Sequence, residues 1–69
     1  MTVGEYIKAR REYYGFSIQE LHRLSGVAAS TISRIEAGNV PHEDSLRAIG
    51  EVFGMKVWQI YIFKDIMKL

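Results

Sequence analysis

Several features that would point to a particular class of protein are missing from this chain. It contains no cysteine, which excludes a disulfide scaffold and a thiolate metal site. Its longest uninterrupted apolar run covers residues 60–63, far below the ~20 residues that a membrane-spanning helix needs. No charged segment followed by an apolar one stands at the N-terminus, as it would in a signal peptide. We therefore expect a cytoplasmic protein with no membrane partner.

An excess of charge of one sign is also missing. Nine Lys and Arg residues against eight Asp and Glu residues leave a formal net charge of +1. Any binding to nucleic acid therefore has to depend on where the charges lie rather than on their number.

His22 and His42 are isolated from one another, and no recognisable nucleophile and base accompany them. We expect no metal, no cofactor and no catalytic residues, and hence no enzyme.

The chain does contain enough apolar material for one small domain. It has 69 residues, of which 48% are hydrophobic. A typical domain has ~100 residues, so a second core would not fit, and we assign residues 1–69 to a single domain. A core of this size hides only about 60% of the surface of the unfolded chain, which makes oligomerisation an expected supplement.

Apolar residues with helical spacing divide the chain into five stretches. Four glycines close the first four of these, since glycine readily takes the left-handed conformation after a helix: Gly15, Gly26, Gly38 and Gly54. The first helix is expected at about residues 3–14, where Thr2 and Glu5 form a capping box at its start. Its apolar stripe consists of Val3, Ile7 and Tyr14, with Tyr6 beside them.

A second capping box, formed by Ser17 and Glu20, begins a helix that ends at Gly26. Two leucines are expected on the inner face of this helix: Leu21 and Leu24. A connection of only residues 26 and 27 separates it from a third helix at about residues 28–37. Two helices joined so tightly cross at a steep angle.

The last two stretches flank Gly54. Pro41 can open a helix but cannot continue one, so we expect a fourth helix at about residues 42–53. Its buried side consists of Leu46, Ile49 and Phe53. Gly50 within it is tolerable if another backbone packs close there.

Residues 57–63 admit two interpretations. Trp58, Ile60 and Ile62 alternate as in a strand, whereas the apolar residues from Ile62 to Met67 are spaced as in a helix. We favour a helix throughout.

Residues 17–38 read SIQELHRLSGVAASTISRIEAG, and this segment carries a specific family pattern. It resembles the helix-turn-helix of the phage repressor/Cro-like family, often called Xre-type. The resemblance covers roughly residues 3–61. It implies an all-α, five-helix repressor-like domain with a central helix-turn-helix at about residues 17–38. The apolar residues of the C-terminal stretch, considered below, add a dimerisation tail at about residues 56–69.

The third helix is then the expected recognition helix, because the ~12 Å major groove of DNA displays a unique pattern of donors and acceptors and admits one α-helix. Ile32 and Ile35, with Val27, define its buried side. The residues expected to face the bases lie on the other side: Ala28, Ala29, Ser30, Ser33 and Arg34. Only Arg34 has the bidentate geometry that favours guanine. The alternative is that this helix is an ordinary surface helix.

Contacts to the DNA backbone are expected around the ends of these helices. Ala28 stands where the family usually has a polar residue such as Ser or Thr, so the first-turn amides of the third helix lack a cap and are open to a phosphate. The expected backbone contacts are Arg11, Ser17, Ile18, Gln19, Thr31 and Asn39. Arg11 also matches a family position that pairs with the position of Glu36, and that pairing is first a structural feature.

Some residues depart from the family pattern. His22 stands where the family prefers Ala, and it either widens the crossing of the second and third helices or points outward; we expect a packing or surface role. Glu43 and Asp44 suit the N-terminal dipole of the fourth helix but would repel a nearby phosphate. The basic residues that could face DNA are Lys8, Arg10, Arg11, Arg23 and Arg34.

The C-terminal stretch carries more large apolar groups than one helix can turn toward its own core. An exposed apolar patch marks an interface, and two-fold self-association is its most economical use. The expected dimer interface consists of Trp58, Ile62, Phe63, Ile66, Met67 and Leu69. We thus predict a homodimeric repressor that reads a roughly palindromic site in double-stranded DNA. The alternative is a protein-interaction module, such as an antitoxin or antirepressor, that acts through this surface.

Overall fold

The computed structural model describes residues 1–66 and folds them into helices without a strand. The helices are α1 (Val3–Tyr13), α2 (Ile18–Ser25), α3 (Ala29–Glu36), α4 (Glu43–Val52) and α5 (Val57–Ile66). The all-α fold class and the expected helices are confirmed. The strand interpretation of residues 57–63 is wrong, because this segment forms most of α5.

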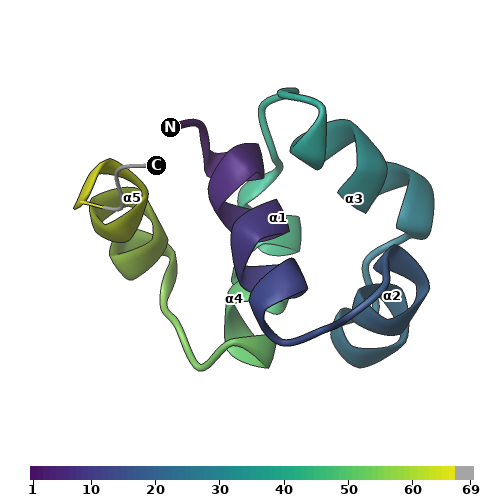
Figure 1. The fold of residues 1–69 in the computed structure, drawn as a ribbon. Helices are drawn as coiled ribbons and strands as arrows, with labels where there is room; N and C mark the ends of the chain where they lie inside the picture. Colours follow the sequence, from purple (N-terminus) through teal and green to yellow (C-terminus); the bar gives the residue numbers. More distant parts are fainter. Residues whose placement is uncertain (67–69) are drawn as a thin grey trace.

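α1 and α4 form the middle of the molecule and separate α5 from α2 and α3 (Figure 1). α1 packs against α3 and α5, and α4 packs against α2 and α5. α2 and α3 also pack on each other and lie at one end, whereas α5 lies at the other end. The helix-turn-helix and the C-terminal helix are therefore well separated surfaces of one small domain, whose principal extents are 28, 23 and 22 Å.

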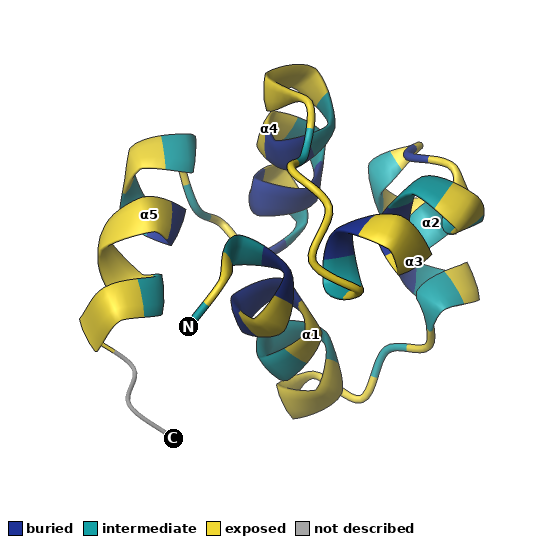
Figure 2. Ribbon diagram, turned by 90° about the horizontal axis from the view of Figure 1, so that it is seen from above, coloured by how far each residue is buried: buried dark blue, intermediate teal, exposed yellow. Residues whose placement is uncertain are grey.

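All five helices contribute side chains to one core. Figure 2 marks the buried residues of the ribbon in dark blue. The buried apolar residues are Tyr6, Ile7, Leu21, Val27, Ile32, Ile35, Leu46, Ile49, Phe53 and Ile60. This set includes the buried residues that the sequence predicts for α3 and α4. Sequestering ten such side chains from water supplies the main driving force for this fold.

Two residues expected on inner faces are exposed instead. Leu24 is 57% exposed, because the inner face of α2 runs through Ile18 and Leu21, and Leu24 stands about 60° beyond Leu21 on the far side from Ile18. Tyr14 is 47% exposed, although its ring stacks on that of Phe53 with centroids 5.6 Å apart. Tyr14 thus covers the edge of the core rather than entering it.

Two glycines allow backbones to meet. A Cβ on Gly4 in α1 would overlap the backbone carbonyl of Ile35 in α3, so these helices touch at a point where no side chain fits. A Cβ on Gly50 would lie 2.6 Å from the carbonyl oxygen of Met55. The close backbone approach that the sequence requires around Gly50 is therefore confirmed, while the sequence analysis did not single out Gly4.

Candidate nucleic-acid interface

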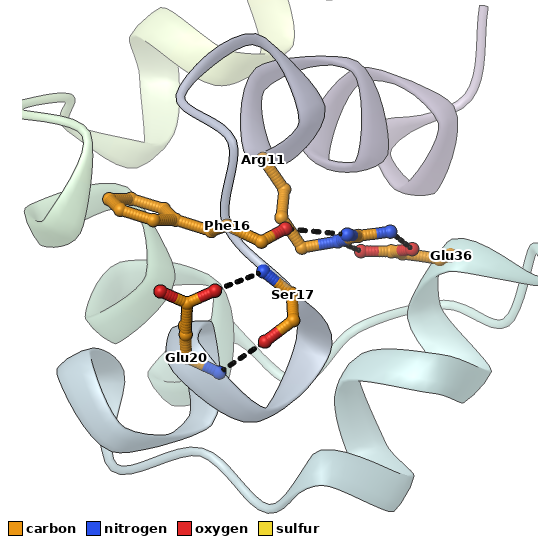
Figure 3. A network of polar contacts seen from close by, with 5 residues as sticks. All are labelled: Arg11, Phe16, Ser17, Glu20 and Glu36. Carbon is orange, nitrogen blue, oxygen red and sulfur yellow. Dashed lines mark hydrogen bonds and ion pairs between the residues drawn. The ribbon is translucent and has the colours of Figure 1, made fainter.

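The start of α2 is fixed by the expected capping box (Figure 3). Ser17 Oγ accepts a hydrogen bond from the Glu20 amide at 3.1 Å, and Glu20 Oε1 accepts one from the Ser17 amide at 2.9 Å. The bond from the Ser17 amide lowers the pKa of Glu20, because it stabilises the carboxylate. The box leaves the next amides, those of Ile18 and Gln19, as the groups at this helix end that can meet a phosphate.

The turn between α2 and α3 uses a left-handed glycine. Gly26 has φ 77°, and its amide donates to the carbonyl of His22 at 2.8 Å. The His22 ring is half-buried, and its Nδ1 lies 2.7 Å from the carbonyl oxygen of Val27. Of the packing and surface roles that the sequence analysis left open for His22, the structure thus shows packing, with a hydrogen bond that the sequence analysis did not anticipate.

α3 presents the side that the sequence predicts. Ile32 and Ile35 are buried, at 0% and 2% exposure, and they anchor the helix to the core. The outward residues differ slightly in exposure, since Ala29 is half-buried while the others are exposed: Ala28, Ser30, Ser33 and Arg34. This face is open to solvent, as a base-reading face has to be. Contact with bases stays a prediction.

The first turn of α3 lacks a side-chain cap. Ala28 is the N-cap residue, with φ −57° and ψ 140°, and no side chain bonds to the amides that follow. The carbonyl of Ala28 accepts the first helical bond, from the amide of Ile32 at 3.0 Å. The amides from Ala29 to Thr31 precede that bond, so they are the donors that an anion at this helix end would meet.

Arg11 is committed to a structural contact (Figure 3). Its Nε and Nη2 donate to the two carboxylate oxygens of Glu36 at 2.8 and 2.9 Å, and its Nη1 donates to the carbonyl of Phe16 at 2.8 Å. The side chains are only 12% and 7% exposed, and the carboxylate raises the pKa of Arg11. The expected pairing is confirmed, and it ties α1 to α3 and to the loop before α2.

A shallow hollow beside α3 brings together residues from the predicted base-facing and backbone-facing sets. It lies between α3, the loop after it and the start of α4, and its polar lining is Thr31, Arg34, Asn39, His42 and Ser45. The sequence analysis did not assign His42 and Ser45 to this surface. His42 and Ser45 lie at the start of α4, whereas Arg34 lies near the end of α3. Only the fold brings these two helix ends together at one hollow.

The basic residues do not all lie where the sequence analysis placed them. Arg23 and Arg34 are exposed on the helix-turn-helix, and Lys8 is exposed on α1. Arg10, in contrast, lies over the rings of Tyr13 and Tyr14, 5.9 and 5.4 Å from their centroids. It lines a hollow on the α5 side of α1, whereas α3 packs elsewhere on α1. The expectation that Arg10 faces DNA is therefore not supported.

α5 carries an exposed apolar face at the end remote from α3 (Figure 2). Ile60 is its one buried residue, at 1% exposure, and it attaches α5 to the core. The four described residues of the expected dimer interface are 43% to 64% exposed: Trp58, Ile62, Phe63 and Ile66. The other two, Met67 and Leu69, lie outside the described residues. The face exists as expected, and its use in a dimer stays a prediction.

Comparison with known families agrees with this geometry. The family described as helix-turn-helix domain matches residues 2–57. The chain belongs to this family. The resemblance to repressor/Cro-like proteins is thereby confirmed, and the match indicates a DNA-binding regulator. It includes α1 to α4 and ends at the first residue of α5.

Two further findings complete the comparison. No curated protein and no solved structure matches the chain significantly. Within residues 1–66, no helix combines the length and the apolar character that crossing a membrane requires.

Proposed function

We propose that this helix-turn-helix domain is a sequence-specific transcriptional repressor that binds double-stranded DNA as a homodimer and has no enzymatic activity. The observation that carries the proposal is the orientation of α3. Its Ile32 and Ile35 are buried, while Ser33 and Arg34 face outward. A helix anchored in this way on the surface of a helix-turn-helix domain can enter the major groove without disturbing the core.

The chemistry of the outward face suits close contact with base edges. Ala28 and Ala29 have only methyl groups, which can lie against a thymine methyl and let the helix backbone approach the bases. The hydroxyls of Ser30 and Ser33 can meet donors or acceptors, and Arg34 can donate two hydrogen bonds to guanine. The expected preference is therefore for a short site that includes one guanine contact per protomer.

Contacts to the phosphates would position this face. The uncapped amides at the start of α3, including that of Thr31, and the amides of Ile18 and Gln19 each lie at the positive end of a helix. Asn39 and Arg34 line the same hollow beside α3. Arg11 has its three nitrogens engaged by Glu36 and Phe16, so we assign it mainly to holding α3 in place.

The exposed face of α5 supports a dimer. Trp58, Ile62 and Ile66 follow one another at intervals of four residues, so they form a single stripe. Pairing of two such stripes about a two-fold axis is the simplest way to cover them. Half-sites about 34 Å apart then require each α3 to lie about 17 Å from that axis, which fits a protomer 28 Å long.

DNA binding is tested by selection of duplexes from a random double-stranded library, followed by mobility shifts with excess nonspecific competitor at two salt concentrations. We expect an enriched, roughly palindromic sequence. The logarithm of the binding constant should fall with the logarithm of salt concentration, with a slope of about −3 per protomer for three phosphate contacts. Binding that does not discriminate between the selected and scrambled duplexes would contradict the proposal.

The dimer is tested by sedimentation of Ile62→Asp, which places a charge in the middle of the α5 stripe. We expect the wild-type protein to sediment as a dimer and this variant as a folded monomer. Leu24→Asp is the matched control, because Leu24 is at least as accessible as Ile62, at 57% against 48% exposure, but lies on α2 at the other end of the molecule. A monomeric wild type would refute this part of the proposal.

Two observations favour a second function: the exposed apolar face of α5, and a family match that does not extend over α5. The match ends at residue 57, so the exposed part of α5 is a feature of this chain beyond the matched domain. A protein-interaction module of the antitoxin or antirepressor type would act through it. In that case, wild-type protein would enrich no duplex from the library, and substitutions in α5 would abolish binding to the protein partner.

A further inference from the structure

Side chains of α2 hold both backbone polar groups of Val27, the residue that precedes the N-cap of α3. The carbonyl oxygen of Val27 lies 2.7 Å from His22 Nδ1. Its amide donates to Ser25 Oγ at 3.1 Å, and that hydroxyl donates in turn to the carbonyl of Leu21 at 2.7 Å. The side chain of Val27 is buried at 8% exposure. Val27 is therefore fixed at its side chain and at both backbone groups.

From this arrangement we infer that His22 and Ser25 are positioning residues for the recognition helix, and that they replace the cap that Ala28 cannot provide. The inference rests on the proposed function for its consequence in DNA binding. A side-chain cap fixes the start of a helix by bonding to the amides of its first turn. His22 and Ser25 fix it one residue earlier, so the amides from Ala29 to Thr31 stay open to a phosphate while the helix start is still held.

The contact defines the protonation of the His22 ring. A carbonyl oxygen only accepts hydrogen bonds, so Nδ1 has to carry the hydrogen. In the neutral ring, Nε2 then has none and can only accept. The bond to Val27 thus selects one of the two tautomers, and the tautomer reports on the contact in the absence of DNA.

The geometry of the ring also supplies a conservative substitution. Nδ1 is bonded directly to Cγ, and so is the amide nitrogen of asparagine. His22→Asn therefore keeps a donor where Nδ1 stands and removes Nε2. His22→Ala removes both nitrogens and leaves a residue with the highest helix propensity, so α2 itself is not weakened. The two variants separate a role through Val27 from a direct contact of Nε2 with DNA.

The experiment has one arm on the free protein and one on DNA. In the free protein, nitrogen NMR at alkaline pH identifies the tautomer of His22, and hydrogen exchange is followed at the amide of Val27. For DNA, affinities are measured for the duplex enriched by wild-type protein and for a scrambled duplex of the same length. The variants are His22→Ala, His22→Asn and Ser25→Ala, with Leu24→Ala as the control on the same helix. All are compared at a temperature where circular dichroism shows each to be folded.

We expect the Nδ1–H tautomer in the neutral ring and faster exchange of the Val27 amide in Ser25→Ala. His22→Ala should lose about five- to tenfold in affinity for the enriched duplex, the equivalent of one hydrogen bond, and much less for the scrambled one. His22→Asn should bind within about twofold of wild type, as should Leu24→Ala. Rescue by Asn is the result that a general loss of stability would not produce.

The inference is overturned by the Nε2–H tautomer, or by a His22→Ala variant that binds the enriched duplex as wild type does. It is also overturned if His22→Asn binds as weakly as His22→Ala, since Nε2 would then act on the DNA directly. Should wild-type protein enrich no duplex, the proposed function fails instead. The tautomer and the exchange of the Val27 amide then still decide whether His22 and Ser25 hold the start of α3.

Discussion

Arg11 and Glu36, 25 positions apart in the chain, form a two-point ion pair in which Nε lies 2.8 Å from Oε2 and Nη2 lies 2.9 Å from Oε1. The pair joins α1 to the last residue of α3. The side chains are only 12% and 7% exposed, so water reaches them poorly and each charge is stabilised mainly by its partner. Together with the buried Ile32 and Ile35, the pair therefore attaches α3 to the rest of the domain.

Removing one partner of this pair should destabilise the protein more than removing both partners. We expect Glu36→Ala to lower the free energy of unfolding by about 3 kcal/mol, because a largely buried guanidinium is left without its partner. The double variant Arg11→Ala/Glu36→Ala should lose less. Chemical denaturation of the single and double variants measures the difference. Arg47→Ala is the control, since its exposed pairs with Glu43 and Asp44 should contribute under about 1 kcal/mol. A double variant less stable than Glu36→Ala would contradict the prediction.

Gly4 should not tolerate alanine. Replacing glycine by alanine within a helix normally stabilises it by about 1 kcal/mol. Here the new Cβ would overlap the Ile35 carbonyl and force α1 away from α3, so we expect a net loss of about 2 kcal/mol or more in the free energy of unfolding. Thermal and urea denaturation would measure it. Lys8→Ala, at an exposed position of the same helix, should change stability little; equal stability of Gly4→Ala and wild type would rule the clash out.

The capping boxes predict that the stability of the folded protein decreases at acidic pH. Hydrogen bonds from the Thr2 and Ser17 amides lower the pKa values of Glu5 and Glu20 below their ordinary 4.5. Their contribution is therefore complete above pH 4.5 and is lost as the pH falls through the lower folded value. Relative to Glu20→Gln, the wild type should have its largest advantage in thermal midpoint near neutral pH and lose it in acid. A constant difference across this range would refute the assignment.

The open amides of α3 predict opposite effects on stability and on DNA affinity. We expect Ala28→Ser to stabilise the free protein by about 1 kcal/mol, because the new hydroxyl caps the first turn. The same hydroxyl would then occupy amides that a phosphate needs, so affinity for the enriched duplex should fall. Denaturation and mobility shifts on the same preparation measure both. Greater stability with unchanged affinity would show that these amides do not bind phosphate.

Much of the helix-turn-helix follows from interactions between neighbours in the chain. The capping boxes at Thr2 and Ser17 and the left-handed turn at Gly26 involve residues within four positions of each other, and they lie where the sequence predicts. The outward side of α3 also follows, because Ile32 and Ile35 leave only one side of the helix for the core. Local hydrogen bonds and apolar spacing are sufficient for these features.

Other parts of the site depend on how the helices meet. The sequence alone left open which way His22 points, since its ring bonds to Val27 only after the turn has brought that carbonyl beside it. Arg10 was among the basic residues that could face DNA, but it lies over the rings of Tyr13 and Tyr14, on the α5 side of α1. Helical spacing alone cannot say which of the solvent-facing residues of α1 lie near α3.

The sequence by itself determined the first four helices, close to their observed ends, and the apolar side of α3, because these depend on dihedral preferences and on bonds spanning one helical turn. Only the tertiary structure decided that Gly4 touches Ile35, that Leu24 faces solvent, and that α5 lies opposite α3 with an exposed apolar face. Such relationships arise from the packing of side chains far apart in the chain, and the spacing of residues within one helix does not contain them.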